Sequence, residues 1–149
     1  MTVWGAMGYN SIGKLVKIDG IMDAKKYMSI LDEGLLPSVT MNGWTRQYTL
    51  QMDNDPKHTS KAAMEYYKKH QLNLLPWPSQ SPDLNPIEHL WDEVSRRMKG
   101  SSRLSQKQYE QKVMDVWSEI PSSYIQKLIN SMPRRLAAVM KAKGGNTRY

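Results

Sequence analysis

The sequence of 149 residues contains no cysteine, no phenylalanine and no apolar run long enough to span a membrane. Without cysteine, a disulfide scaffold and a thiolate metal site are excluded, so a bound metal would need carboxylate, histidine or carbonyl ligands. The N-terminal residues also lack the basic and apolar regions of a secretory signal. We therefore expect a soluble intracellular protein with no transmembrane segment and no membrane partner.

Acidic residues are unevenly distributed, and the first 18 residues contain none. Residues 1–95 carry 9 Lys and Arg against 11 Asp and Glu, whereas residues 96–149 carry 12 against 3. The basic C-terminal segment suits a polyanionic partner, because contacts between phosphates and Lys or Arg release condensed counterions. The alternative is a solvated helical surface whose charges keep the protein soluble.

Segments with a period of two residues alternate with helical segments along the chain. The segments typical of strands are residues 2–9, 13–20, 46–53 and 72–78. The segments typical of helices are residues 23–36, 60–71, 87–100, 105–120 and 122–143. We expect Pro37 to end the first helix and Pro133 to interrupt or kink the last. This order favours an α/β fold, with a mixed sheet that starts in a hairpin and is flanked by helices.

Two acids stand at positions that suit metal binding. Asp53 follows the strand "RQYTLQMD", and ligand sites in open α/β sheets collect at the carboxyl ends of strands. Glu88 falls in the first turn of a helix that Asn85 can cap and Pro86 can begin, so closing a capping box is an alternative role for it. If Asp53 and Glu88 meet, their oxygens suit Mg²⁺ or Mn²⁺. Cleavage of a phosphodiester by two metal ions would need about three such acids.

Other side chains around these acids and in the basic segment are candidates for nucleic-acid contacts. Lys57 could contact phosphate, and His58 could contact phosphate or orient a water, although a surface lysine and a structural histidine are the alternatives. Asp55, which precedes Pro56, is typical of a turn. Trp77 could stack on unpaired bases, whereas Trp91 and Trp117 suit core packing. The candidates in the basic segment are Arg96, Arg97, Arg134, Arg135, Lys141 and Lys143.

Two segments together resemble the catalytic signature of Tc-one/mariner superfamily DDE transposases. They are "QMDNDPKHTSKAA" and "WPSQSPDLNPIEHLW", and 34 residues separate Asp53 from Glu88, as in one branch of that family. The resemblance implies a ribonuclease H-like fold, with residues 1–98 as catalytic core and 99–149 as a linker and basic C-terminal helices of the same domain. It also implies that Asp53 and Glu88 are the second and third acids that bind two Mg²⁺ ions, and that the protein acts on DNA in the nucleus.

The first catalytic Asp of that family has no counterpart here. It would lie on a first, central strand upstream of "VWGAMG", whereas Asp19 and Asp23 lie at the end of the second predicted strand and in the turn to the first helix. We therefore expect a core that lacks the central strand, weak or absent metal binding, and no transposition by these residues alone. Whether the chain is an enzyme stays open. The alternatives are a non-catalytic remnant that binds DNA, a second copy of itself or a transposase subunit, and an inert decayed copy.

Overall fold

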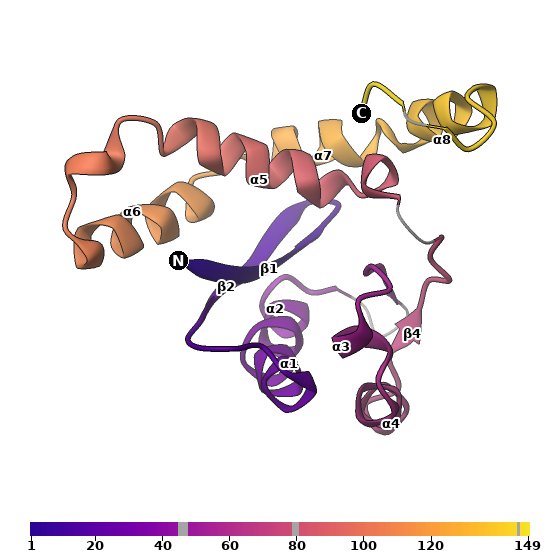
Figure 1. Cartoon of the computed structure of the whole chain (residues 1–149), viewed down its shortest axis with the longest axis horizontal. Coiled ribbons are helices and arrows are strands. Elements are labelled where there is room, and N and C mark those ends of the chain that lie inside the picture. The colour runs from indigo at the N-terminus through magenta and orange to yellow at the C-terminus, as the bar shows by residue number, and fades with distance from the viewer. Residues whose placement is uncertain (45–47, 79–80, 146) are drawn as a thin grey trace. The chain divides into compact units, whose positions relative to one another are not determined.

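The chain begins with the predicted hairpin, in which β1 (Thr2–Gly8) and β2 (Ser11–Ile18) are joined at Tyr9 and Asn10 (Figure 1). The computed structural model describes residues 1–44, 48–78, 81–145 and 147–149. These residues divide into two compact units, of which the first comprises residues 1–6 and 13–81 and the second residues 7–12 and 82–149. Each unit is described by itself.

The first unit contains a long helical segment after the hairpin. Its parts are α1 (Ala24–Ile30), the π-helical turn η1 (Leu31–Leu35) and α2 (Leu36–Met41). Asp23 caps α1, since its carboxylate accepts the backbone N–H of Lys26 at 2.7 Å. The expectation that the helix ends at Pro37 is wrong. Pro37 lies in the first turn of α2, where a missing N–H donor costs little because the preceding turn is already π-helical.

Close contacts hold the hairpin against this helical segment. A Cβ added to Gly34 would lie 2.6 Å from the Trp4 ring and 2.8 Å from Val16, so only glycine fits there. The fully buried Ser38 hydroxyl accepts the backbone N–H of Lys14 at 2.7 Å. The hairpin is therefore packed on the side of η1 and α2.

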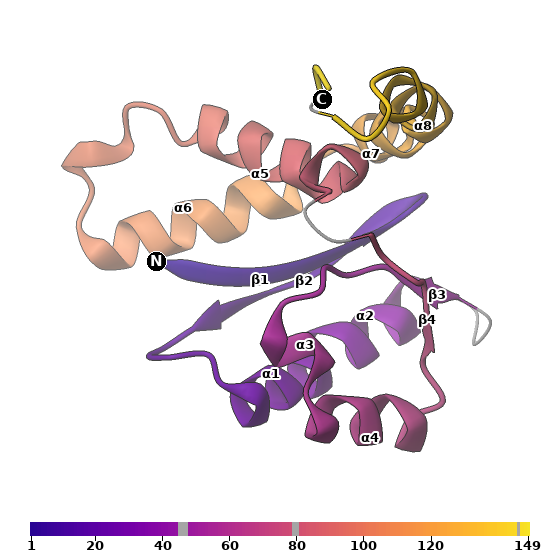
Figure 2. The same ribbon diagram turned by 45° about the vertical axis from the view of Figure 1, so that its right-hand side comes forward.

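The strand that leads to Asp53 is shorter than predicted. Here β3 (Thr49–Leu50) pairs in parallel with β4 (Asn73–Leu74), with Thr49 opposite Asn73 (Figure 2). Residues 46 and 47 of the predicted strand lie outside the described ranges. Within those ranges the strands form two separate two-stranded sheets instead of one continuous mixed sheet. The edges of β1 and β3 therefore do not pair with each other, as expected if a central strand belongs between them.

Aromatic and aliphatic side chains fill the core of the first unit. The short helix α3 (Pro56–Thr59) and the longer α4 (Lys61–Lys69) follow β3, and Ser60, the first residue of the predicted helical segment 60–71, caps α4. The buried core cluster consists of Tyr27, Leu31, Leu35, Ala63, Tyr66 and Tyr67. The Tyr66 hydroxyl donates to Asp32 at 2.5 Å and so links α4 to η1.

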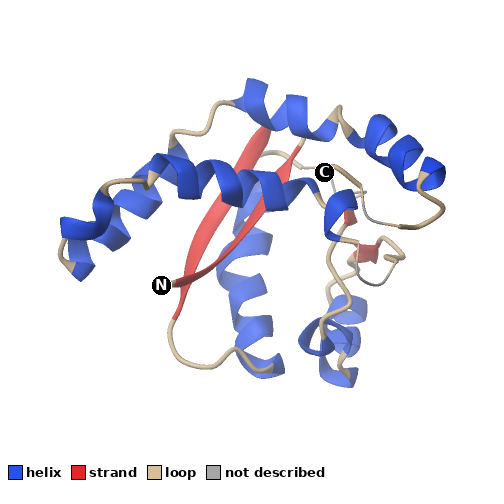
Figure 3. Cartoon of the chain, turned by 45° about the horizontal axis from the view of Figure 1, so that its top comes forward, coloured by secondary structure: helices blue, strands red, loops and turns tan. Residues whose placement is uncertain are grey.

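Helices make up most of the second unit (Figure 3). They are the 3₁₀ turn η2 (Pro82–Leu84), α5 (Pro86–Arg97), the 3₁₀ turn η3 (Ser101–Arg103), α6 (Gln106–Ser118), α7 (Ser122–Ile129) and α8 (Met132–Lys141). Trp117 of α6 is buried, which confirms its predicted core role, and it stacks at 4.9 Å on the half-buried Trp91 of α5. Pro133 lies in the first turn of α8, so the predicted interruption is confirmed. In the parts of the chain that the structure covers, no helix has the length and apolarity to cross a bilayer.

Candidate functional site

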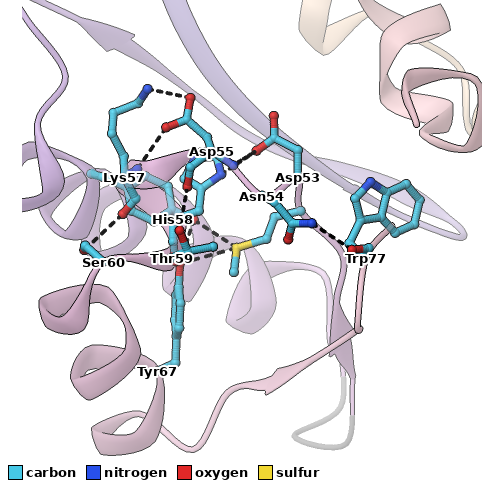
Figure 4. A network of polar contacts seen from close by, with 11 residues as sticks. Asp53, Asn54, Asp55, Lys57, His58, Thr59, Ser60, Tyr67 and Trp77 are labelled. Atoms are coloured by element: carbon cyan, nitrogen blue, oxygen red, sulfur yellow. Dashed lines mark hydrogen bonds and ion pairs between the residues drawn. The ribbon is translucent and has the colours of Figure 1, made fainter. Parts of the chain in front are cut away.

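Asp53 lies three residues beyond the end of β3, at the carboxyl edge of the parallel pair. Its side chain is 61% exposed. The carboxylate oxygen Oδ1 accepts the backbone N–H of Asp55 at 3.3 Å and contacts His58 Nδ1 at 2.6 Å. In the described ranges no group donates to Oδ2, and in Figure 4 this second oxygen points away from His58. One oxygen of Asp53 is thus held by the protein and the other is open.

The segment after Asp53 is folded by its own polar side chains. Asp55 caps α3 by accepting the backbone N–H of Lys57 at 2.9 Å, and it pairs with Lys57 Nζ at 2.6 Å. The hydrogen bonds from Lys57, the one from its ammonium group first, lower the pKa of Asp55. The predicted turn role of Asp55 is confirmed. The ammonium group of Lys57, a predicted phosphate contact, is therefore already paired with the Asp55 carboxylate.

His58 is largely buried against the tyrosine core, with only 15% of its side chain exposed. Its ring lies 4.3 Å from the ring of Tyr27, and its backbone carbonyl accepts the Tyr67 hydroxyl at 3.0 Å. The hydroxyls of both tyrosines also lie close to Met52 Sδ, at 3.4 and 3.3 Å. Burial raises the pKa of Tyr27, so its hydroxyl stays protonated. His58 therefore lies beside Asp53 and packs against buried tyrosines, so most of its side chain is shielded from solvent.

Asn54 links this segment to the residues that follow β4. Its side-chain amide donates to the backbone carbonyl of Trp77 at 2.8 Å, and the Trp77 indole is half-buried (Figure 4). Trp77 thus lies on the same edge as Asp53. Whether its ring stacks on a base stays a prediction.

Glu88 is an exposed residue in the first turn of α5. Asn85 caps this helix as predicted, since its side chain accepts the backbone N–H of Ile87, and Pro86 is the first helical residue. Asp53 belongs to the first unit and Glu88 to the second. Among the residues covered by the structure, no three His, Asp or Glu side chains form a cluster that could hold a metal ion. The meeting of Asp53 and Glu88 stays a prediction.

Glu93 forms ion pairs with two of the basic residues predicted to contact DNA. Its side chain is 10% exposed and accepts hydrogen bonds from Arg96, at 2.8 Å, and from Arg97, at 2.7 Å. These bonds, the one from Arg96 first, lower the pKa of Glu93 to about 2. Arg96 remains 64% exposed, whereas Arg97 is only 29% exposed. A buried acid within a basic stretch was not anticipated from the sequence, although its spacing of three and four residues from the arginines is typical of helical ion pairs.

Arg135 is the basic candidate that the structure removes from the surface. The residue is 1% exposed, and its guanidinium donates to Ser131 Oγ at 2.7 Å and to the backbone carbonyl of Asp83 at 2.8 Å. It also lies 4.8 Å from the centre of the Tyr149 ring. The burial of Arg135 and its hydrogen bonds inside the second unit therefore disfavour the predicted contact with DNA, which stays a prediction.

The other basic candidates near the C-terminus face solvent. Arg134 is exposed on α8, and Lys141 and Lys143 are exposed at and beyond its end. None of the three makes an ion pair with another residue of the described ranges. Their charges are thus available to a polyanion.

The sequence matches the DDE superfamily endonuclease family over residues 1–110. It is 44% identical over 147 residues to the transposases of the transposable elements Tcb1 of Caenorhabditis briggsae and Tc1 of Caenorhabditis elegans. Each of these alignments covers 99% of this chain and 54% of the relative. The chain therefore spans about half the length of the curated relatives it matches.

Solved structures of Mos1 transposase have a similar fold. The Mos1 catalytic domain with Raltegravir and Mn superposes with a TM-score of 0.82 at 19% identity, over 98% of this chain and 76% of that one. The Mos1 mariner paired end complex with Mn has the same TM-score at 19% identity, over 94% of this chain and 43% of that one. The predicted α/β, ribonuclease H-like fold class is confirmed by this likeness.

Proposed function

The chain belongs to the DDE superfamily endonucleases, and we propose that it is the C-terminal part of the catalytic domain of a Tc-one/mariner-type DNA transposase. The observation that carries this proposal is the carboxylate of Asp53, placed at a strand edge with one oxygen held and one open. Relatives of this chain that are 44% identical are transposases of transposable elements. In this proposal residues 1–98 contribute the core, and residues 99–149 contribute basic helices of the same domain.

Asp53 and Glu88 are the proposed ligands of Mg²⁺ or Mn²⁺. Their donor chemistry fits, because both are exposed carboxylates and hard divalent cations prefer carboxylate and water oxygens. Bound there, such a cation would polarise a phosphodiester and lower the pKa of a water or hydroxyl nucleophile. Two acids alone fall short of the roughly three that a two-metal site uses, so we expect weak binding. The related Mos1 structures contain Mn or Mg.

DNA is the proposed partner, and the nucleus the proposed location. The exposed charges of Arg134, Lys141 and Lys143 supply the attraction to phosphates. Lys57, Arg96 and Arg97 are weaker candidates, because Asp55 and Glu93 already pair with them. Mos1 has been solved as a paired end complex and with a left transposon end, which supports DNA as the ligand of the family's fold.

A second candidate function is a non-catalytic remnant that binds DNA or assembles with a second copy or a transposase subunit. It is favoured by the lack, among the residues that the structure covers, of a cluster of three potential ligands. The two functions differ in one respect, namely whether the two acids do any chemistry.

Nicking of supercoiled plasmid in Mn²⁺ distinguishes these functions. We expect no strand transfer and at most slow nicking, which Asp53→Ala and Glu88→Ala each abolish. Glu65→Ala is the matched control, because it removes an exposed helical acid from α4 and should leave nicking unchanged. Nicking that survives in both acid variants would contradict the catalytic assignment. Retention on DNA without any nicking would favour the remnant.

A further inference from the structure

One oxygen of the Asp53 carboxylate is held by His58, for which the sequence predicts a contact with phosphate. His58 Nδ1 lies 2.6 Å from Asp53 Oδ1, a short distance typical of a hydrogen bond to a charged acceptor. An ionised carboxylate oxygen only accepts hydrogen bonds, so this contact needs the ring proton on Nδ1 when Asp53 is a carboxylate. The contact therefore holds one oxygen of the carboxylate and favours the tautomer with the proton on Nδ1.

The other ring nitrogen is buried without a partner. His58 Nε2 has no hydrogen bond within the parts of the chain that the structure covers, and it is shielded from solvent. A buried polar atom without a partner costs about 1–3 kcal/mol, so a purely structural histidine would gain by turning outward. The ring is kept inward by the aromatic contact with Tyr27 at 4.3 Å and by the Tyr67 hydroxyl on the His58 backbone. In this arrangement Nε2 makes no hydrogen bond, whereas the contact between Nδ1 and Asp53 is kept.

The geometry points to a specific role for this arrangement, and we propose that His58 is a positioning residue for Asp53. It donates from Nδ1 to Oδ1 and so aims Oδ2 outward as the oxygen available to a divalent cation. This inference deepens the proposed function and rests on the metal role of Asp53. It replaces the DNA contact expected for His58, because Nδ1 is engaged with Asp53 and only 15% of the side chain is exposed.

A fixed carboxylate binds a cation better because less rotational freedom is lost on binding. Hydrogen-bond partners of metal ligands typically change metal affinity by about 10- to 100-fold when they are removed. We therefore expect His58→Leu to weaken Mn²⁺ binding at Asp53 by about tenfold or more. His58→Asn should retain most of the affinity, since the Asn amide nitrogen is bonded to Cγ as Nδ1 is and can donate to Oδ1.

The test uses NMR of the whole chain and has two readouts. The first is the ring tautomer of His58 in the wild type without metal, from the shifts of its two ring nitrogens. The second is the Mn²⁺ concentration that broadens the Asp53 and Asn54 amide signals in the wild type, His58→Leu and His58→Asn. His70→Leu is the matched control, because His70 also stacks on a tyrosine, Tyr66 at 4.2 Å, but has no contact with Asp53.

Two results together would support the proposal. The wild-type ring should carry its proton on Nδ1. The Mn²⁺ affinity at Asp53 should fall tenfold or more in His58→Leu, recover in His58→Asn and stay unchanged in His70→Leu. A proton on Nε2 alone, or equal broadening in the wild type and in folded His58→Leu, would overturn it. If Mn²⁺ has no effect at Asp53 in the wild type, the metal role of Asp53 fails and the proposal falls with it. An intact Nδ1–H tautomer would then show that this failure belongs to the metal site and not to the His58 contact.

Discussion

Arg135 should act inside the second unit, whereas its neighbour Arg134 should act on DNA. The two arginines are adjacent on α8, but one is 1% exposed and the other is on the solvent side. Replacing each with Met keeps most of the apolar stem and removes the guanidinium. This pair of variants separates a structural charge from a surface charge on the same helix turn.

The expected loss of stability follows from the bonds that Arg135 makes. Its guanidinium donates at 2.7 Å to Ser131 and at 2.8 Å to the Asp83 carbonyl, and it contacts the Tyr149 ring. Hydrogen bonds from charged donors contribute about 1.5–3 kcal/mol each, and part of that gain offsets the burial of the charge. Arg135→Met should therefore lower the opening free energy of α8 by about 3 kcal/mol, whereas Arg134→Met should change it by less than about 0.5 kcal/mol.

Amide hydrogen exchange of α7 and α8 measures these free energies locally, independently of the first unit. Binding to a short DNA duplex at low salt gives the second readout. We expect Arg134→Met to weaken DNA binding without loss of protection, and Arg135→Met to lose protection while the folded fraction binds DNA as before. Equal protection in the two variants, or a loss of DNA affinity in a fully protected Arg135→Met, would show that Arg135 acts on DNA and not inside the second unit.

Three further predictions concern Glu93, Gly34 and the C-terminal lysines. Because the folded pKa of Glu93 is lowered from 4.5 to about 2, its ion pairs stabilise the protein above that ordinary value and are lost as the pH falls through this range. Glu93→Gln should remove about 1–3 kcal/mol at neutral pH and flatten the acid limb of a pH-dependent urea titration. Gly34→Ala should cost about 1–3 kcal/mol in chemical denaturation, because its Cβ would collide with the Trp4 ring. Lys141→Ala with Lys143→Asn, where Asn tolerates the φ of 50°, should reduce the salt dependence of DNA binding by up to about one unit of log–log slope per lost phosphate contact.

Local signals in the sequence predicted the helices well. Asn85 and Pro86 mark the start of α5, and Ser60 marks the start of α4, because capping residues act within one turn of the helix they begin. Pro37 was misjudged for a related reason. A proline usually ends a regular α-helix, because its ring clashes with the carbonyl of the preceding turn. Here the preceding turn is π-helical, which relieves that clash, and no residue of η1 predicts such a turn.

Features that depend on tertiary packing could not be read from the sequence. Strand β3 is described over two residues and pairs with β4 alone in the ranges described, and a strand pattern by itself does not reveal which strands will pair. Arg134 and Arg135 have the same residue type, and only the packing of α8 on η2 decides which is buried. The short-range contact between Asp53 and His58 spans five residues, yet it depends on the α3 turn that Asp55 caps.

The proposed metal site is tested most directly by whether Asp53 and Glu88 bind the same ion. Mn²⁺ should be titrated into the labelled chain while the amide signals of both residues are followed, with Mg²⁺ as a competitor. If the two acids bind one ion, both signals should broaden together in the millimolar range, and Asp53→Ala should protect the Glu88 signal. Independent broadening of the two signals, or broadening at Glu88 that is unchanged in Asp53→Ala, would contradict a shared metal site.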